Sequence, residues 1–501
     1  MRFRSCLPQP PVNPSSAPRS RALRVLRSCA LAAAISVPLA GASELPELPD
    51  LGDVSRGVLS VAQERQIGIE VMREVRNDRS FLDDAELNAY LANLGYRLAS
   101  NSPDARIAFE FFVMDDRLIN AFALPGGFIG VHTGLMATAQ TESELAAVIA
   151  HEIAHVTQGH IARLVANQQQ AQVGSIVAMA LALLAARSNP QLAQGAIIGA
   201  QAAVVQSQLN FTRDMERDAD RVGLSILERS GFDVRGMSSF FERLQRATRS
   251  FETSAPAYLR THPVTTERIA DALNRIDTLP YRQVRDDPEF QFVRTRLLAM
   301  QGTPREAVQT FDNGLRQGAY INEAAQRFGL VHALMRTRDY ARAQKELRAL
   351  RPIAPRLPMI DALEGDLLVV AGNLKGAAAF YQAALIEHPR YRALVYDYAD
   401  LLIRTGQPRE ALRIASDALQ YYPSDHRLFF IQARAHAELG QVLSQGRVQA
   451  EANVLLGNRA LAIEQLQNAL RAGDGDFFEL SSAESRLREL RAQQPPRKGR
   501  G

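Results

Sequence analysis

Cysteine and tryptophan are almost absent from this sequence of 501 residues. It has two cysteines, Cys6 and Cys29, and no tryptophan. Both cysteines lie between Met1 and Ala42, a segment with the features of a cleaved leader. The rest of the chain therefore has no disulfide and no thiolate ligand, so any metal it binds must be held by histidine and carboxylate side chains.

The segment from Met1 to Ala42 also lacks acidic side chains. It carries six arginines, followed by the apolar run CALAAAISVPLA and by Ala40-Gly41-Ala42. This order is typical of a secretory signal peptide, although the basic part is long, and we expect cleavage after Ala42 and export to the periplasm. An alternative start codon near Ser20 would explain the long basic part.

The mature chain has no excess of basic charge. The whole sequence has 58 basic and 54 acidic residues, a net charge of +4, but removal of the leader leaves 52 basic residues against the same 54 acids. We therefore expect no nucleic-acid partner. The best later candidate for a membrane span, over positions 173–186, is shorter than the roughly 20 residues that a membrane-crossing helix needs.

Segments with different patterns follow the leader. Residues 43 to about 110 are polar with helical periodicity, and residues 109–131 read as short strands around a Pro-Gly-Gly turn. The strand FIGVH is a candidate free edge for an added peptide strand, or else a packed strand. For residues 171–209, rich in Ala and Gln, we expect a helical hairpin packed on the core; the alternative is a mobile lid or a segment that contacts the membrane surface.

The stretch AHEIAHVTQGH holds three histidines and should be helical. Thr141 to Glu144 fits a capping box, with Thr141 as the cap and Glu144 reaching back, which predicts a helix over residues 142–166. His160 lies nine residues after His151, or half a turn away on such a helix. We interpret His160 as a structural residue, or as one that contacts a metal ligand without binding the metal itself.

The other two histidines form an H-E-x-x-H motif. His151 and His155 are four residues apart and face the same side of a helix, with Glu152 beside them. On a helix this motif is typical of zinc hydrolases, in which the histidines bind zinc and the glutamate is the general base. The alternative is an ordinary helix with surface histidines.

Carboxylates in FTRDMERDADRVG are the candidates for a third ligand. Glu216 and Asp220 are four residues apart and share a helix face, whereas Asp218 points away from it. Three protein ligands would leave a fourth position for water, as in catalytic zinc sites. The alternative is that this stretch is only a charged helix face.

Repetition begins at about residue 290. Gly372, Gly406 and Gly440 recur at equal intervals. An alanine lies five residues after each of the turn positions Gly302, Arg338, Gly372, Gly406 and Gly457. A period of about 34 residues with small side chains at fixed places is typical of tetratricopeptide repeats. The step from Gly406 to Gly457 is one and a half times this period, which predicts an inserted helix over residues 441–456.

The motifs resemble those of the HtpX and CAAX-prenyl-protease group of gluzincin metallopeptidases, and within it the branch of beta-barrel assembly-enhancing proteases. The resemblance rests on NAFALPGGFIGVHTGL, AHEIAHVTQGH, MERDADRVG and RTHP, and it covers residues from about 60 to 490. It implies Glu216 as the third zinc ligand and Asp220 as the residue that orients a ligating histidine. It also implies degradation of misassembled outer-membrane proteins and help to others at the β-barrel assembly machinery.

His262, in the stretch RTHPVTTER, has two interpretations. Pro263 disfavours helical backbone at His262 and so predicts a loop. One interpretation is a surface or capping residue. In the other, His262 occupies or borders the fourth position of the zinc as a regulatory ligand until a substrate moves the loop, or it stabilises the oxyanion of the reaction.

Taken together, these patterns predict a mainly α fold. We expect a signal peptide over residues 1–42, a zincin metallopeptidase domain with a small β-sheet over 43–285, and a tetratricopeptide-repeat α-solenoid over 286–495. The expected function is that of a periplasmic zinc-dependent endopeptidase with chaperone-like activity on outer-membrane β-barrel proteins, with one zinc per subunit. The alternative is a non-proteolytic adaptor whose repeats hold outer-membrane-protein intermediates.

Overall fold

The computed structural model describes residues 59–104, 107–167, 213–250, 257–280, 282 and 284–493. The predicted leader and the predicted hairpin over residues 171–209 lie outside these residues. No helix in the described part of the chain is long and apolar enough to cross a membrane.

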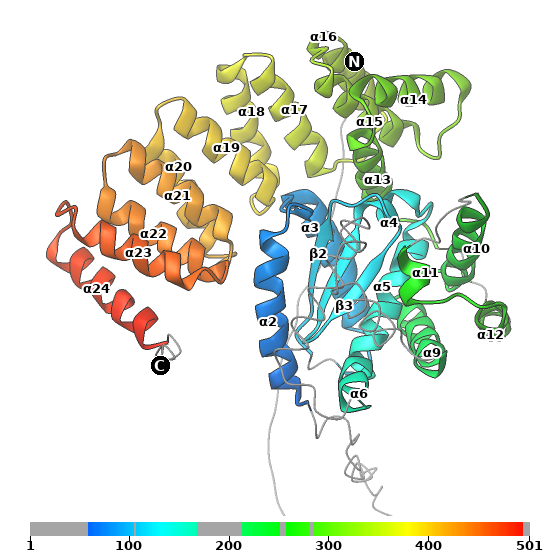
Figure 1. The fold of residues 1–501 in the computed structure, drawn as a ribbon. Coiled ribbons are helices and arrows are strands. Elements are labelled where there is room, and N and C mark those ends of the chain that lie inside the picture. Colours follow the sequence, from blue (N-terminus) through cyan, green and yellow to red (C-terminus); the bar gives the residue numbers. More distant parts are fainter. Residues whose placement is uncertain are drawn as a thin grey trace, which may run out of the picture. The chain divides into compact units, whose positions relative to one another are not determined.

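A four-stranded sheet lies in the N-terminal half of the chain (Figure 1). It consists of β1 (Phe81–Leu82), β2 (Glu110–Met114), β3 (Ala121–Leu124) and β4 (Phe128–His132), in the order β1-β2-β4-β3. β2 and β4 are parallel, and the other two pairs are antiparallel. The predicted turn joins β3 to β4, and its Gly126 and Gly127 have φ angles of 77° and 85°, which side chains with a Cβ rarely adopt.

The prediction that FIGVH presents a free edge is wrong. This strand is β4, which pairs with β2 on one side and β3 on the other, and all five of its residues are buried. Among the described strands it is β3 that ends the sheet on this side. An added peptide strand would therefore pair with β3.

Helices cover both faces of the sheet because its strands are apolar on both sides. Phe112 and Met114 of β2 pack with α2 (Val61–Asn77). The alternate residues Phe111 and Val113 join a second core with α3 (Ala85–Ala99) and α5 (Glu142–Thr157). α5, which carries the H-E-x-x-H motif, is thereby packed against the sheet, and all sixteen of its residues are buried.

The motif helix begins where the sequence predicts but ends earlier. The Thr141 side chain accepts a hydrogen bond from the Glu144 N–H, while the Glu144 carboxylate accepts one from the Gln140 N–H instead of from Thr141. α5 stops at Thr157, because Gly159, with φ 63°, turns the chain. His160 therefore starts a separate helix, α6 (His160–Asn167), and the single helix predicted over 142–166 is wrong.

Further helices complete the peptidase part of the chain: α4 (Thr133–Thr138), α9 (Arg213–Arg229), α10 (Arg235–Ser250), α11 (Ala257–Thr261) and α12 (Thr266–Asp277). α9 packs closely on α5 at Gly223. A Cβ added to Gly223 would lie 3.1 Å from the Cα and N atoms of His151. The missing side chain lets α9 approach the motif closely.

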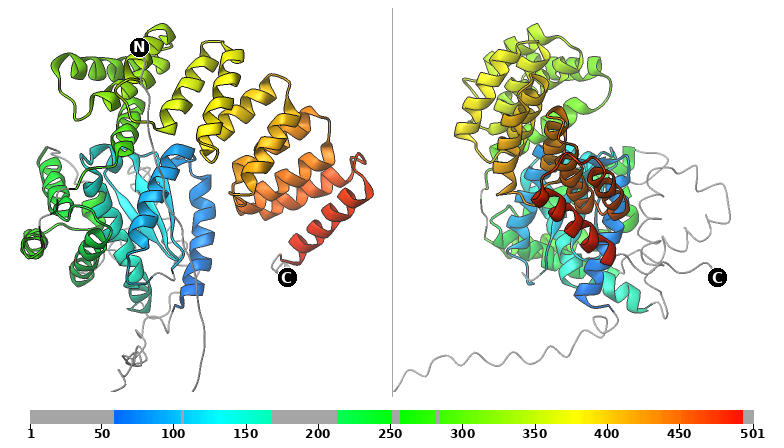
Figure 2. Two further views of the ribbon diagram at one scale, coloured as in Figure 1. Left: turned by 180° about the vertical axis from the view of Figure 1, so that it is seen from behind. Right: turned by 90° about the vertical axis from the view of Figure 1, so that its left-hand side faces the viewer.

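The repeat region consists of stacked antiparallel helices, which Figure 2 shows from two further sides. They are α13 (Pro288–Met300), α14 (Pro304–Gln317), α15 (Glu323–Arg336), α16 (Tyr340–Leu350), α17 (Pro358–Val370), α18 (Leu374–Glu387), α19 (Arg392–Arg404), α20 (Pro408–Leu419), α21 (His426–Glu438), α22 (Val442–Leu455), α23 (Arg459–Leu470) and α24 (Phe477–Ala492).

Backbone geometry explains the glycines of the repeat. Gly372, Gly406 and Gly440 each end the first helix of a pair with φ between 71° and 83°, and Arg338 takes the same position with φ 61°. The predicted inserted helix is present as α22, which is joined to α21 and to α23 by short turns. Three helices, α20, α21 and α22, thus lie between Gly406 and Gly457, which accounts for the longer step.

Candidate metal centre

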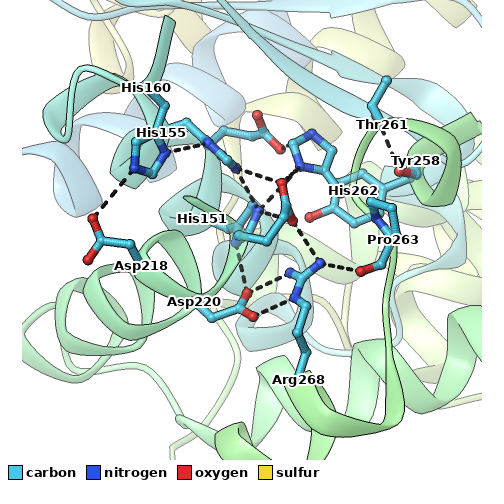
Figure 3. A network of polar contacts seen from close by, with 12 residues as sticks. His151, His155, His160, Asp218, Asp220, Tyr258, Thr261, His262, Pro263 and Arg268 are labelled. Atoms are coloured by element: carbon cyan, nitrogen blue, oxygen red, sulfur yellow. Dashed lines mark hydrogen bonds and ion pairs between the residues drawn. The ribbon is translucent and has the colours of Figure 1, made fainter. Parts of the chain in front are cut away.

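Four buried side chains from three segments converge on one point (Figure 3). His151 and His155 come from α5, Glu216 from α9, and His262 from the loop between α11 and α12. Each is at most 2% exposed, and one ligand atom of each lies within 4.8 Å of the ligand atoms of the others. His262 is thus buried beside the motif, and its interpretation as a surface residue is wrong.

The distances between these ligand atoms suit a tetrahedral metal ion. His151 Nε2 lies 3.0 Å from His155 Nε2 and 3.4 Å from His262 Nδ1. Glu216 Oε1 lies 3.4 Å from His155 Nε2 and 2.9 Å from His262 Nδ1. Ligands at bond lengths of about 2.0–2.2 Å around a tetrahedral zinc are roughly 3.3 Å apart. These four distances are thus close to that spacing, and all four donor atoms lie within 4.8 Å of one another.

Glu152 lies beside the four donor residues and does not belong to their group. It is fully buried, and its Oε1 lies 3.5 Å from His262 Nε2. Neither of its carboxylate oxygens has a hydrogen-bond partner among the described residues. Since a buried carboxylate without a partner is costly, this arrangement favours a site where the missing partner is a metal ligand or a substrate group.

Asp220 stands behind the first histidine of the motif. Its Oδ1 lies 3.0 Å from His151 Nδ1, the ring nitrogen that faces away from Glu216. A histidine that binds a metal through one ring nitrogen commonly donates from the other to a carboxylate, which fixes the tautomer and the ring orientation. The contact is the one expected of a residue that orients His151.

His160 lies outside the cluster but contacts His155, and Asp218 contacts His160. His160 Nδ1 is 2.8 Å from His155 Nδ1, and His160 Nε2 is 3.5 Å from Asp218 Oδ2. His160 reaches this place through the turn at Gly159, and not through the continuous helix from which its orientation was predicted. Neither residue belongs to the group of donor atoms that could hold a metal.

Burial and neighbouring charges shift the pKa values of the cluster in opposite directions. Burial lowers the pKa of His151, but hydrogen bonds to Asp220 and Glu216 outweigh it and raise the pKa to about 9. Burial and the neighbouring imidazoles hold the pKa of His155 well below its usual value. Burial raises the pKa of Glu216, but His262 and the other histidines hold it well below its usual value. These directions favour an ionised Glu216 and a neutral His155, as metal ligands must be, whereas His151 has to give up a proton when a metal binds.

One residue of this network is missing from the sequence-based prediction. Arg268, on the first turn of α12, contacts both Asp220 and Glu216. The only signal for it is its position six residues after His262 in RTHPVTTER. No spacing rule links this arginine to α9, because the contact depends on how α12 packs.

Both parts of the chain match known protein families. Residues 84–276 match the model of Peptidase family M48, and residues 368–437 match a tetratricopeptide repeat. The chain is 30% identical to the beta-barrel assembly-enhancing protease of Escherichia coli over 450 residues, and this aligned region covers 89% of this chain and 92% of the relative. It is 29% identical over 446 residues to the protein of the same name from Yersinia pestis, which covers 89% and 91%.

A more distant relative shares only the peptidase part. The chain is 30% identical to the mitochondrial metalloendopeptidase OMA1 of Schizosaccharomyces pombe over 200 residues, 40% of this chain and 56% of the relative. The match to the Escherichia coli protein, in contrast, runs through both the peptidase and the repeats. The chain is therefore a metallopeptidase of the beta-barrel assembly-enhancing protease family.

Proposed function

We propose that this chain is a zinc-dependent endopeptidase of the periplasm that acts in the quality control and assembly of outer-membrane β-barrel proteins. One observation carries the proposal: four buried donor atoms within 4.8 Å of one another lie next to Glu152, whose carboxylate accepts no hydrogen bond from the described residues. The names of the full-length relatives support the client class, and the leader-like segment 1–42 supports export. The proposed peptidase domain spans residues 43–285 and the proposed repeat domain 286–495.

His151, His155 and Glu216 would hold the zinc. Bound zinc acts as a Lewis acid that polarises the carbonyl of the scissile peptide bond. Glu152 lies beside these ligands and is not one of them. It accepts the proton of the attacking water and passes it to the leaving amine. Asp220 keeps the His151 ring oriented through the contact of 3.0 Å at Nδ1.

His262 acts as a latch in this proposal. Its ring lies against Glu216 and within 3.5 Å of Glu152, so it occupies the side of the site where a substrate carbonyl would have to enter. Removal of this ring in His262→Ala should raise proteolysis of unfolded substrates, or self-cleavage, while zinc content stays unchanged. A fall in activity would instead assign His262 to stabilisation of the oxyanion. Unchanged activity would exclude both roles.

The repeats supply the second candidate function, the holding of unfolded clients without cleavage. A cavity of about 400 Å³ opens between α18, α19 and α20. Its lining combines apolar side chains, among them Leu385, Ile386 and Ile414, with the charged side chains of Glu410, Arg413 and Asp417. Ile386 is 79% exposed. Such a surface favours contact with apolar polypeptide segments.

Glu152→Gln separates the two functions. The amide cannot accept a proton, but the ligand set is intact, so the variant should retain one zinc per chain and lose casein digestion by about 100-fold or more. The exposed Glu70→Gln on α2 serves as the charge-matched control and should behave as wild type. Wild-type turnover in Glu152→Gln would exclude the proposed base. Improved client assembly with this variant would assign that activity to the repeats alone.

A further inference from the structure

Arg268 is a buried cation at the back of the candidate metal centre. It lies in the first turn of α12, where the side chain of Thr265 caps the helix by accepting a hydrogen bond from the Arg268 N–H. Only 3% of Arg268 is exposed. A guanidinium is removed from water at such a position only when its donors are matched by acceptors, so the contacts of Arg268 indicate what it does.

The guanidinium has three partners, two carboxylates of α9 and the carbonyl of Pro263 (Figure 3). Nε and Nη2 donate to the two carboxylate oxygens of Asp220 at 2.6 and 2.7 Å. Nη1 donates to the carbonyl of Pro263 at 2.8 Å and lies 2.7 Å from Oε2 of Glu216. One side chain thus joins both site carboxylates of α9 to the loop that carries His262.

The contacts with Asp220 and Glu216 hold carboxylates that belong to the metal centre or face one of its histidines. The Asp220 oxygen that accepts from Nη2 is also the one that lies 3.0 Å from His151 Nδ1. The ion pair with Glu216 holds Oε2, whereas Oε1 lies toward His155 and His262. Glu216 and Asp220 are one helical turn apart and both buried, so without a cation between them their charges would repel and their side chains would turn apart.

We infer that Arg268 is a positioning residue of the metal centre. Its guanidinium sets the orientation of Glu216 directly and that of His151 through Asp220, and it ties the backbone beside His262 to the same two carboxylates. This inference rests on the proposed metal centre but not on any client or cleavage activity.

Geometry, and not charge alone, is required for this role. Three donor nitrogens held in one plane reach Asp220 twice and Glu216 once. A lysine ammonium carries the same charge on one atom and cannot span both carboxylates. Arg268→Lys therefore retains the cation and removes the fork, which makes it the informative replacement.

Metal affinity is the measurement, made on the full chain by competition with a chromophoric chelator for zinc and for cobalt. Arg268→Lys and Arg268→Gln should each weaken metal binding about 10- to 100-fold, the usual effect of losing a residue that orients ligands. The visible absorption of bound cobalt should shift, because the ligand geometry changes. Added guanidinium ion should partly restore affinity in Arg268→Ala, since it refills the space with the same fork.

Arg243 provides the matched control. This arginine also lies in the peptidase part, but it is half-buried where Arg268 is fully buried. Its Nε and Nη2 donate to Glu144 at 3.1 and 2.8 Å. Arg243→Gln should lower the melting temperature but leave the metal affinity and the cobalt spectrum of the folded protein unchanged.

The outcomes separate this inference from the proposed function. Wild-type affinity and cobalt spectrum in Arg268→Lys and Arg268→Gln would overturn the inference alone. Equal weakening in Arg243→Gln would also overturn it, because the effect would then be general destabilisation. A wild-type chain that binds neither zinc nor cobalt would overturn the metal centre and this inference with it. If Arg268→Ala fails to fold, the lysine variant still decides the question.

Discussion

Glu86 is a buried carboxylate where α3 meets the repeat helices, and it should make the stability of the fold depend on pH. Its Oε1 accepts a hydrogen bond of 2.8 Å from the Tyr391 hydroxyl, and its Oε2 lies 2.8 Å from Arg296 Nη1. Burial raises the pKa of Glu86 from 4.5 to about 7, although Arg296 acts in the opposite direction. The perturbation we consider is Glu86→Gln, which has nearly the same shape and no titration.

The sign follows from the direction of the shift. The folded chain holds the Glu86 proton more tightly than the unfolded chain does, so protonation favours folding. This contribution is fully present below pH 4.5 and is lost as the pH rises to about 7. A shift of this size corresponds to about 3 kcal/mol of unfolding free energy, at about 1.4 kcal/mol per pH unit. In Glu86→Gln that loss should disappear.

Urea unfolding at a series of pH values between about 5 and 8 tests this reasoning. Circular dichroism and tyrosine fluorescence report the transition, since the chain has no tryptophan. The unfolding free energy of Glu86→Gln relative to wild type should change by about 3 kcal/mol in favour of the variant across this range. The exposed Glu70→Gln is the control. Parallel pH curves for wild type and Glu86→Gln would refute the assignment of a raised pKa to this carboxylate.

Five other replacements test three local features of the structure. His151→Ala should abolish tight zinc binding, whereas His160→Ala, which removes only the contact behind His155, should weaken it by about 10-fold; equal losses in a chelator competition would contradict this order. Gly223→Val should lower the melting temperature and the zinc affinity together, because its Cβ would lie 3.1 Å from the His151 backbone and overpacking of this kind costs about 1–3 kcal/mol. Arg338→Gly should raise the unfolding free energy by about 0.5–1 kcal/mol, because a φ of 61° strains a residue with a Cβ. Gly372→Ala should lower the unfolding free energy for the same reason. If both variants changed it in the same direction, backbone strain would not be the cause.

Local periodicity predicted those parts of the site that one helix encodes. The pairs His151 and His155, and Glu216 and Asp220, are each four residues apart, so helix geometry alone places them on common faces. The glycine period of the repeats reflects one backbone requirement, the left-handed turn that ends the first helix of a pair. Such features depend on neighbours within a few residues, and a single sequence contains that information.

Features that depend on one glycine or on strand pairing were predicted wrongly. Gly159 breaks the motif helix, yet an isolated glycine in a helical pattern is often tolerated, so the sequence offers no rule that distinguishes the two cases. The edge of the sheet depends on the parallel pairing of β2 with β4, which leaves β3 outside. Central strands and edge strands can both be apolar, so the five residues of FIGVH do not show which of the two this strand is.

The placement of His262 follows from contacts at both ends of its segment, and these contacts connect the proposed latch to the proposed peptide-binding edge. The Tyr258 N–H donates to the carbonyl of Ile119, two residues before β3, and the His262 N–H donates to the carbonyl of Tyr258. The Tyr258 ring stacks on the His262 ring with centroids 4.8 Å apart. A peptide strand that pairs with β3 and continues past its start would compete with Tyr258 for the Ile119 carbonyl. Loss of that hydrogen bond would free the stacked pair of rings from the sheet, so that binding of a substrate at the edge and withdrawal of His262 from Glu216 favour each other.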